Sequence, residues 1–152
     1  TTTTTGTGTT SFGATSVGGA LDVTSAGAVS QSGALSVTTT SAINAGSAAI
    51  TLTNGSNNFV GAVGLTGGIT QITDTNALTL GVLNTGALTV VSTGALNLGS
   101  GTVGGALSAT SNGGAMTQTG ALTITGTNTS TLSAGAGSIT LGSANDFGGT
   151  VT

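Results

Sequence analysis

The chain has 152 residues and contains no Lys, Arg, His, Cys, Trp, Tyr, Pro or Glu. Its charged side chains are three aspartates, Asp22, Asp74 and Asp146, which give a formal net charge of −3. Most groups used for acid–base, nucleophilic or metal chemistry are therefore missing, and we expect no enzyme, no cofactor and no metal site. The lack of basic residues argues against nucleic-acid binding and against a polybasic membrane patch. The lack of cysteine rules out disulfides.

Short apolar clusters nevertheless run along the whole chain. Low charge with many Gly, Ser and Thr residues is typical of disordered segments. Here Ala, Val, Leu and Ile recur in alternating groups, and the mean hydropathy is positive. No apolar run approaches the roughly 20 residues of a membrane-spanning helix, and the N-terminus lacks the pattern of a signal peptide. We therefore expect a folded chain that does not insert into a membrane.

The predicted elements are short strands that follow one another from the N-terminal to the C-terminal part of the chain. A five-residue unit, Gly-Ala-Leu-x-Val/Leu/Ile, begins at Gly19, Gly33, Gly86, Gly94 and Gly120. Variants of this alternation fill the gaps at residues 49–52, 69–72, 77–80 and 138–141. A period of two directs the apolar side chains inward and the polar side chain between them outward. The inward positions form a predicted core ladder: Leu21, Val23, Leu35, Val37, Ile50, Leu52, Leu78, Leu80, Leu88, Val90, Leu96, Leu98, Leu107, Leu122, Ile124, Ile139 and Leu141.

The segments between these strands are predicted to be turns. They are rich in Gly, Asn, Ser and Thr, and they include Asn54-Gly55 and Asn112-Gly113. Gly and Asn tolerate the positive φ angles that sharp corners require. The three aromatic residues are expected to fill the wider corners: Phe12, Phe59 and Phe147.

A longer repeat is superimposed on the short one. Residues 28–37 match residues 115–124, and residues 17–63 as a whole resemble residues 103–151, at a separation of about 87 residues. If one coil takes about 20 residues in three strand–turn steps, this separation is about four coils and the chain holds about seven. The sequence thus predicts an all-β fold, a right-handed parallel β-solenoid, with residues 1–152 forming a single segment.

The chain resembles the β-strand repeats of large bacterial surface proteins of the filamentous haemagglutinin and autotransporter adhesin type. The resemblance covers nearly the whole chain and rests on the Gly-Ala-Leu-x-Val units, on residues 49–54 and on residues 145–151. It implies a right-handed β-helical rod that is exported to the cell surface or the extracellular space. There it would act in adhesion, in a biofilm matrix or as a scaffold. It implies no catalytic residues.

Neither end of the chain shows an obvious polar cap. An open terminal coil exposes unpaired backbone groups and apolar ladders, so we expect either further repeats in a longer protein or end-to-end self-association into filaments. Low charge also permits lateral packing of rods. The leading hypothesis is a structural, protease-resistant extracellular fibre, because trypsin-type cleavage sites are absent. The alternative is an adhesin segment, although the sequence names no receptor or glycan.

Particular residues also match the patterns of other functions. Residues 99–104 match the dinucleotide-binding pattern G-x-G-x-x-G, but a strand pattern follows them, which favours a turn. Asp22 is expected to face outward in a strand, Asp74 to lie in the turn of residues 73–76, and Asp146 to lie in a turn equivalent to Asn58. These settings argue against a carboxylate pair for glycoside hydrolysis. A calcium role is disfavoured because the glycine-rich nonapeptide of calcium-binding solenoids is absent.

Thr-x-Thr arrays keep an ice-binding role open as a less favoured alternative. They occur at residues 51/53, 73/75 and 123/125/127. They do not recur at one constant coil period in the sequence, and outward strand positions account for most threonines.

Overall fold

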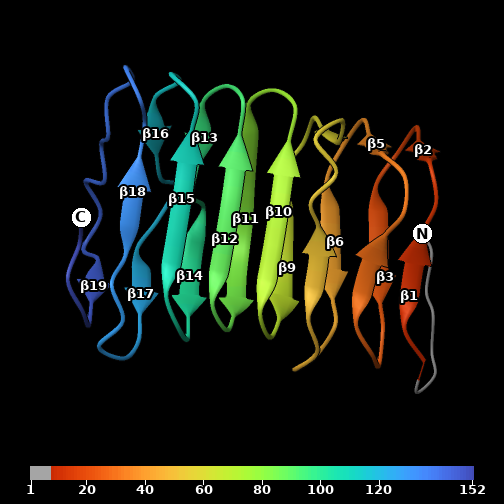
Figure 1. Cartoon of the computed structure of the whole chain (residues 1–152), viewed down its shortest axis with the longest axis horizontal. Coiled ribbons are helices and arrows are strands. Elements are labelled where there is room, and N and C mark those ends of the chain that lie inside the picture. The colour runs from red at the N-terminus through yellow and green to blue at the C-terminus, as the bar shows by residue number, and fades with distance from the viewer. Residues whose placement is uncertain (1–7) are drawn as a thin grey trace.

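The computed structural model describes residues 8–152, and within this range the chain is built from strands with no helix. Figure 1 shows the strands stacked in a row from the N-terminal to the C-terminal end. The strands are β1 (Thr10–Phe12), β2 (Thr15–Val17), β3 (Leu21–Thr24), β4 (Val29–Gln31), β5 (Leu35–Val37), β6 (Ser41–Asn44), β7 (Ile50–Leu52), β8 (Asn58–Phe59), β9 (Val63–Gly67), β10 (Thr70–Asp74), β11 (Leu78–Thr85), β12 (Leu88–Ser92), β13 (Leu96–Asn97), β14 (Ser100–Val103), β15 (Leu107–Ser111), β16 (Met116–Thr117), β17 (Leu122–Ile124), β18 (Thr131–Ser133) and β19 (Asp146–Phe147).

The strands form three faces of a parallel β-solenoid. The first face has the order β1-β4-β7-β10-β12-β15-β18, and the second face has the order β3-β6-β9-β11-β14-β17-β19. The third face consists of β2-β5-β8 and, further along, of β13 and β16. Every pairing between strands is parallel, and each joins one coil to the next. The described residues make about seven coils, which confirms the predicted parallel β-solenoid.

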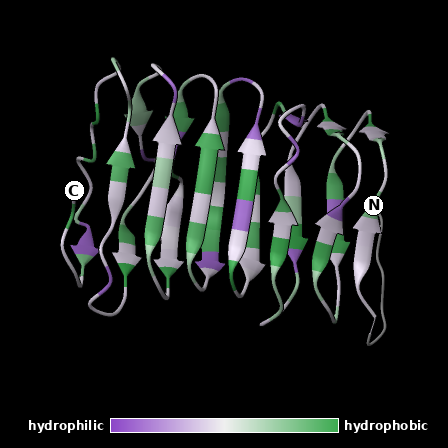
Figure 2. Cartoon of the chain, viewed as in Figure 1, coloured by the Kyte–Doolittle hydropathy of each residue, from purple (hydrophilic) through white to green (hydrophobic). Residues whose placement is uncertain are grey.

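Stacking places equivalent side chains directly above one another. On the first face Leu52 is in register with Ile72, Ile72 with Val90 and Val90 with Ala109. The strands alternate buried and exposed positions, and Figure 2 shows this alternation as hydrophobic bands separated by polar ones. Burying one Leu or Ile side chain contributes roughly 1.5–3 kcal/mol, so a continuous aliphatic column stabilises each pair of coils.

Most of the predicted core ladder is inside the solenoid. The side chains that are at most 2% exposed are Leu21, Val23, Leu35, Val37, Ile50, Leu52, Leu78, Leu80, Leu88, Val90, Leu96, Leu98, Leu107, Leu122 and Ile124. Leu141 is only partly buried, and Ile139 is 44% exposed. The assignment of Ile139 to the core is therefore wrong. Ile139 bridges to Met116 in the preceding coil, and within residues 8–152 no strand pairs with it on the other side.

One inward column contains a polar residue without a partner. Ser41 is in register with Leu21 on one side and with Val63 on the other, and its side chain is 3% exposed. Its hydroxyl oxygen is buried without a hydrogen bond. Ser92 on the first face is also buried, but its hydroxyl lies 2.8–3.0 Å from the carbonyl oxygens of Asn76, Gly94 and Ala95 and can donate its proton to one of them.

We expect Ser41→Ala to stabilise the protein by about 1 kcal/mol, because it removes a buried hydroxyl that gains no hydrogen bond on folding. The matched control Ser92→Ala should destabilise the protein by about 1 kcal/mol or more, because it removes the hydroxyl that donates to a buried carbonyl oxygen and accepts from the Gly94 N–H. Chemical denaturation of the two variants measures both changes. Equal effects of the same sign would contradict this account of the two hydroxyls.

The corners depend on glycine at a few places. Within residues 8–152, positive φ angles occur at Gly46, Gly99, Gly101, Gly113, Gly126 and Gly135 and at no other residue type. Gly113 therefore has the positive φ angle predicted for it, whereas Gly55 does not.

The three aromatic residues each end a strand. Phe12 and Phe59 are buried, and Phe147 is partly buried. No helix in the described part of the chain is long and apolar enough to cross a membrane.

Candidate functional site

A network of polar side chains fills the corner between the first and third faces. The Asn57 side chain is fully buried. Its Oδ1 accepts hydrogen bonds from the Leu35 backbone N–H at 2.8 Å and from Gln31 Nε2 at 2.8 Å. Its amide nitrogen donates to Gln31 Oε1 at 2.9 Å and approaches the carbonyl oxygens of Leu52 and Thr73 at 3.1 Å. One side chain therefore links three successive coils.

The same set of hydrogen bonds recurs four coils further along the solenoid, at the corner between the third and second faces. Asn145 Oδ1 accepts from Gln118 Nε2 at 2.8 Å and from the Leu122 backbone N–H at 2.9 Å, while Asn145 Nδ2 donates to Gln118 Oε1 at 2.9 Å. The long repeat in the sequence aligns Gln31 with Gln118, but it does not by itself point to Asn57 and Asn145. A signal for them exists in the sequence, because Asn57 directly precedes Asn58-Phe59 and Asn145 directly precedes the matching Asp146-Phe147 of the long repeat.

Asp74 occupies the corner between the first and third faces in the coil that follows that of Asn57. It ends β10 and is fully buried, so its predicted place in a turn is wrong. Its carboxylate accepts hydrogen bonds from the Phe59 N–H at 2.8 Å and the Asn76 N–H at 3.2 Å. Burial raises the pKa of Asp74, and these two backbone hydrogen bonds oppose that rise. The chain has no Lys, Arg or His that could offset the buried charge.

We expect the free energy of unfolding to depend on pH through Asp74. Because its folded pKa lies above the unfolded value of 3.8, the folded state holds the proton more tightly. Stability should be greatest below the unfolded pKa, fall as the pH rises through the folded pKa, and then stay level. Denaturation series at several pH values should show this decline for the natural chain and not for Asp74→Asn. The control variant Asp22→Asn, at an exposed residue, should keep the decline of stability with pH. If Asp22→Asn abolished this decline, Asp74 would not be its cause.

The three aspartates do not come together. Asp22 is exposed on β3, as expected, whereas Asp146 is exposed within β19 and not in the predicted turn. Asp22 lies in the first described coil, Asp74 in the fourth and Asp146 in the last. Asp74 is therefore three strand spacings along the solenoid axis from each of the other two, a distance of about 14 Å. The carboxyl groups of glycoside hydrolases are roughly 5–10 Å apart. No cluster of three or more potential metal ligands is found within residues 8–152.

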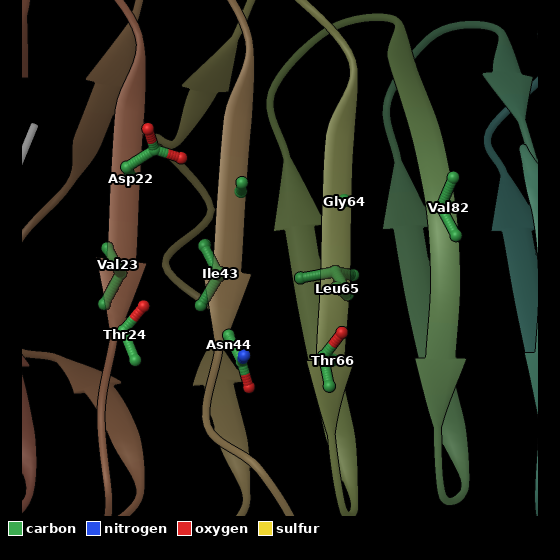
Figure 3. Close-up of a pocket in the computed structure, with 10 residues that line it drawn as sticks. Asp22, Val23, Thr24, Ile43, Asn44, Gly64, Leu65, Thr66 and Val82 are labelled. Atoms are coloured by element: carbon green, nitrogen blue, oxygen red, sulfur yellow. The ribbon is translucent and has the colours of Figure 1, made fainter.

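A groove lies on the second face, across β3, β6, β9 and β11. It has a volume of about 510 Å³ and is lined by Asp22, Val23, Thr24, Ala42, Ile43, Asn44, Gly64, Leu65, Thr66 and Val82. Asp22, Ala42 and Gly64 are in register on adjacent strands, so two small residues form its floor. Figure 3 shows Asp22 at one end of the groove and Val82 at the other. Val82 is 71% exposed.

A β-bulge in β11 forms the Val82 end of this groove. Leu80 pairs with Val63 and Leu83 with Leu65, so two residues of β11 stand opposite Gly64 alone. The extra residue bends the strand and directs Val82 toward solvent. The next coil accommodates the bulge with Gly99 at φ +67° and Gly101 at φ +125°.

These glycines explain the G-x-G-x-x-G match. A Cβ at Gly99 would clash with the carbonyl oxygen of Gly81, and one at Gly101 would clash with that of Leu83. Residues Ser100–Val103 form strand β14, which pairs with β11 and β17, so the prediction of a turn here is wrong. The glycines serve the close approach of two backbones.

Polar side chains continue outward along the second face. Thr24, Asn44, Thr66, Asn84 and Thr102 are in register on five adjacent strands, and we call this column the Asn/Thr ladder. Asn44 is held in place because its Oδ1 accepts a hydrogen bond from the Gly46 N–H at 2.9 Å. The alternation of inward and outward residues along each strand predicts that these side chains face outward. It does not predict that amide and hydroxyl groups alternate from coil to coil.

The Thr-x-Thr arrays are divided between faces. Thr51 lies on the first face in register with Gln71, and Gln71 is in register with Thr89. Thr123 lies on the second face, in register with Thr102 and Asp146. The three arrays therefore do not combine into one uniform threonine surface.

The fold and the recurring corner networks define a repeat protein of the β-solenoid class. The model of one repeat family matches the chain twice, over residues 1–66 and 85–152. The chain thus belongs to the family described as "Repeats of unknown function (DUF5649)". No curated protein and no solved structure matches it. Residues 67–84, between the two matched segments, contain β10, most of β11, the buried Asp74 and the bulge.

Proposed function

We propose that this chain is a structural segment of an extracellular or cell-surface bacterial fibre, in which stacked coils form a stiff rod. The observation that carries the proposal is the unbroken parallel pairing on the first face from β1 to β18. Each internal coil is hydrogen-bonded to both neighbours, and buried apolar columns and corner amides add contacts between them. In such a stack the stability of each coil depends on its neighbours, which favours cooperative resistance to local opening.

Composition and resemblance support the same role. The chain has no Lys or Arg for trypsin-type proteases, and its few charges produce little repulsion between neighbouring rods. The resemblance to repeats of the filamentous haemagglutinin type favours export to the cell surface. The last coil leaves Ile139 and Val151 44% and 46% exposed, which is compatible with stacking against further coils, either of the same protein or of another copy.

Cryo-electron microscopy of the natively purified protein tests this proposal. Long uniform filaments or rods with an axial spacing of about 4.8 Å would support it, because that is the distance between stacked strands. Short discrete particles that never join end to end or continue into a longer rod would overturn it and favour a ligand-binding module.

An adhesin segment is the second candidate function. The observation that favours it is the groove on the second face, which exposes polar side chains over several coils. A rod that presents such a groove could combine a structural role with attachment to a matrix.

A further inference from the structure

The Asn/Thr ladder repeats every second coil. Thr24, Thr66 and Thr102 alternate with Asn44 and Asn84 along the second face. Adjacent parallel strands are about 4.8 Å apart, so identical groups recur about every 10 Å along the solenoid axis. A linear ligand with a twofold repeat of that length would meet the same hydrogen-bonding group at each repeat.

Asn44, Thr66 and Asn84 at the centre of this line are uncharged; Asp22 flanks the line at one end, and Asp146 lies in register beyond Thr102 and Thr123 at the other. The Asn44 side chain uses its oxygen for the Gly46 N–H, while its amide nitrogen has no partner in the described part of the chain. Asn84 and Thr66 have no side-chain hydrogen bonds there either, and Asn84 is exposed. An anionic ligand would meet Asp22 and no cation, which disfavours phosphate or acidic polymers.

The groove beside the ladder has a flat apolar floor. Ala42 and Gly64 project little above the sheet, and Val82 stands at one end where the β-bulge directs it outward. This combination of a narrow apolar strip with amide and hydroxyl groups along one side suits a sugar chain. The C–H face of each sugar ring can rest on the floor while its hydroxyls bond to the ladder.

We propose that this groove binds an extended, neutral β-1,4-linked polysaccharide lying along the solenoid axis. In such a chain successive sugars are turned over, and one disaccharide is about as long as two rungs of the solenoid. Asn44 and Asn84 would then contact equivalent hydroxyls of consecutive disaccharides. An α-1,4-linked glucan coils and would leave this line after one or two sugars.

This inference does not depend on the fibre proposal, since a stiff rod could form whether or not the groove is occupied. The groove has no aromatic side chain on which a sugar ring could stack, so the binding of a single disaccharide should be weak. The affinity should rise with oligosaccharide length until the ligand spans the ladder, and tandem repeats should raise it further.

The test is an NMR titration of the isotope-labelled chain with cellohexaose and, separately, with N-acetylated chitohexaose; maltohexaose serves as the control sugar. We expect either β-linked hexasaccharide to shift signals of Ala42, Asn44, Gly64 and Asn84, with maltohexaose at least tenfold weaker. Asn84→Ala should weaken binding about fivefold, as expected for one lost hydrogen bond.

Gly64→Leu should abolish binding by filling the floor. A Cβ at Gly64 meets only ordinary contacts, 3.6 Å from the carbonyl oxygen of Val82, so the fold should tolerate this change. The matched control Gly18→Leu, at a position with open space around its Cβ, should bind normally. The proposal is overturned if neither β-linked sugar binds, if maltohexaose binds equally well, or if correctly folded Gly64→Leu still binds.

Discussion

Replacing Leu35 with Asp is expected to destabilise the solenoid by about 5 kcal/mol or more. Leu35 is 0% exposed on β5, and its backbone N–H is already used by Asn57. An Asp here would lose the apolar burial and place a carboxylate where no cation of the chain can reach it. Thermal or chemical unfolding followed by circular dichroism measures the loss. The change should also reduce end-to-end assembly in electron micrographs if coils must be intact to stack.

Val82→Asp is the matched control for this substitution. It introduces the same charge at an aliphatic residue that is 71% exposed, so its effect on stability should stay within about 0.5 kcal/mol. If Leu35→Asp melted like the natural chain, the inward register of the Gly-Ala-Leu-x-Val units would be wrong. If both variants unfolded, charge in general would be the cause, and burial at Leu35 would not explain the effect.

The aliphatic ladder could be predicted from the sequence because it depends on local alternation. Leu35 and Val37 are buried since a strand places every second side chain on the same face, and this holds before any partner strand is known. Ile139 shows the limit of that reasoning. It has the same local pattern, but its burial depends on whether another coil covers it, and that information is not local.

The polar corners could not be predicted in the same way. Asn57 is buried because Gln31, Leu35 and Thr73 from the neighbouring coils satisfy its amide, and these partners are 16–26 residues away in the chain. Viewed locally, an Asn between Ser56 and Asn58 predicts an exposed turn. Asp74 was assigned to a turn for the same reason.

The fourth coil shows why the groove was also missed. Its second-face strand, β11, runs for eight residues, whereas the repeat unit predicted separate short strands. The bulge within it depends on Gly64 in the preceding coil and on Gly99 and Gly101 in the following coil. The family model matches the chain on both sides of residues 67–84 and not within them. The feature that shapes the groove therefore lies where the repeat pattern is weakest.

The two equivalent corner networks allow one substitution to be compared in two surroundings. We expect Asn57→Leu to lower the free energy of unfolding by about 3 kcal/mol or more, because it leaves the buried Leu35 N–H without a partner and removes two hydrogen bonds of the Gln31 side-chain amide. Asn145→Leu removes the same hydrogen bonds to Leu122 and Gln118, but Asn145 is only partly buried, so water can replace them. Its cost should be about 1 kcal/mol.

Chemical denaturation midpoints of the two variants, together with amide hydrogen exchange, separate the possible outcomes. The Leu35 amide should lose protection in Asn57→Leu, because its hydrogen bond to the side chain disappears while the strand remains paired. Equal losses of stability at both positions would mean that neighbouring coils add nothing to the value of the corner amide. A larger loss at Asn57 would show that the network gains its strength from being enclosed on both sides, which is the property a long stack of coils needs in order to resist opening from within.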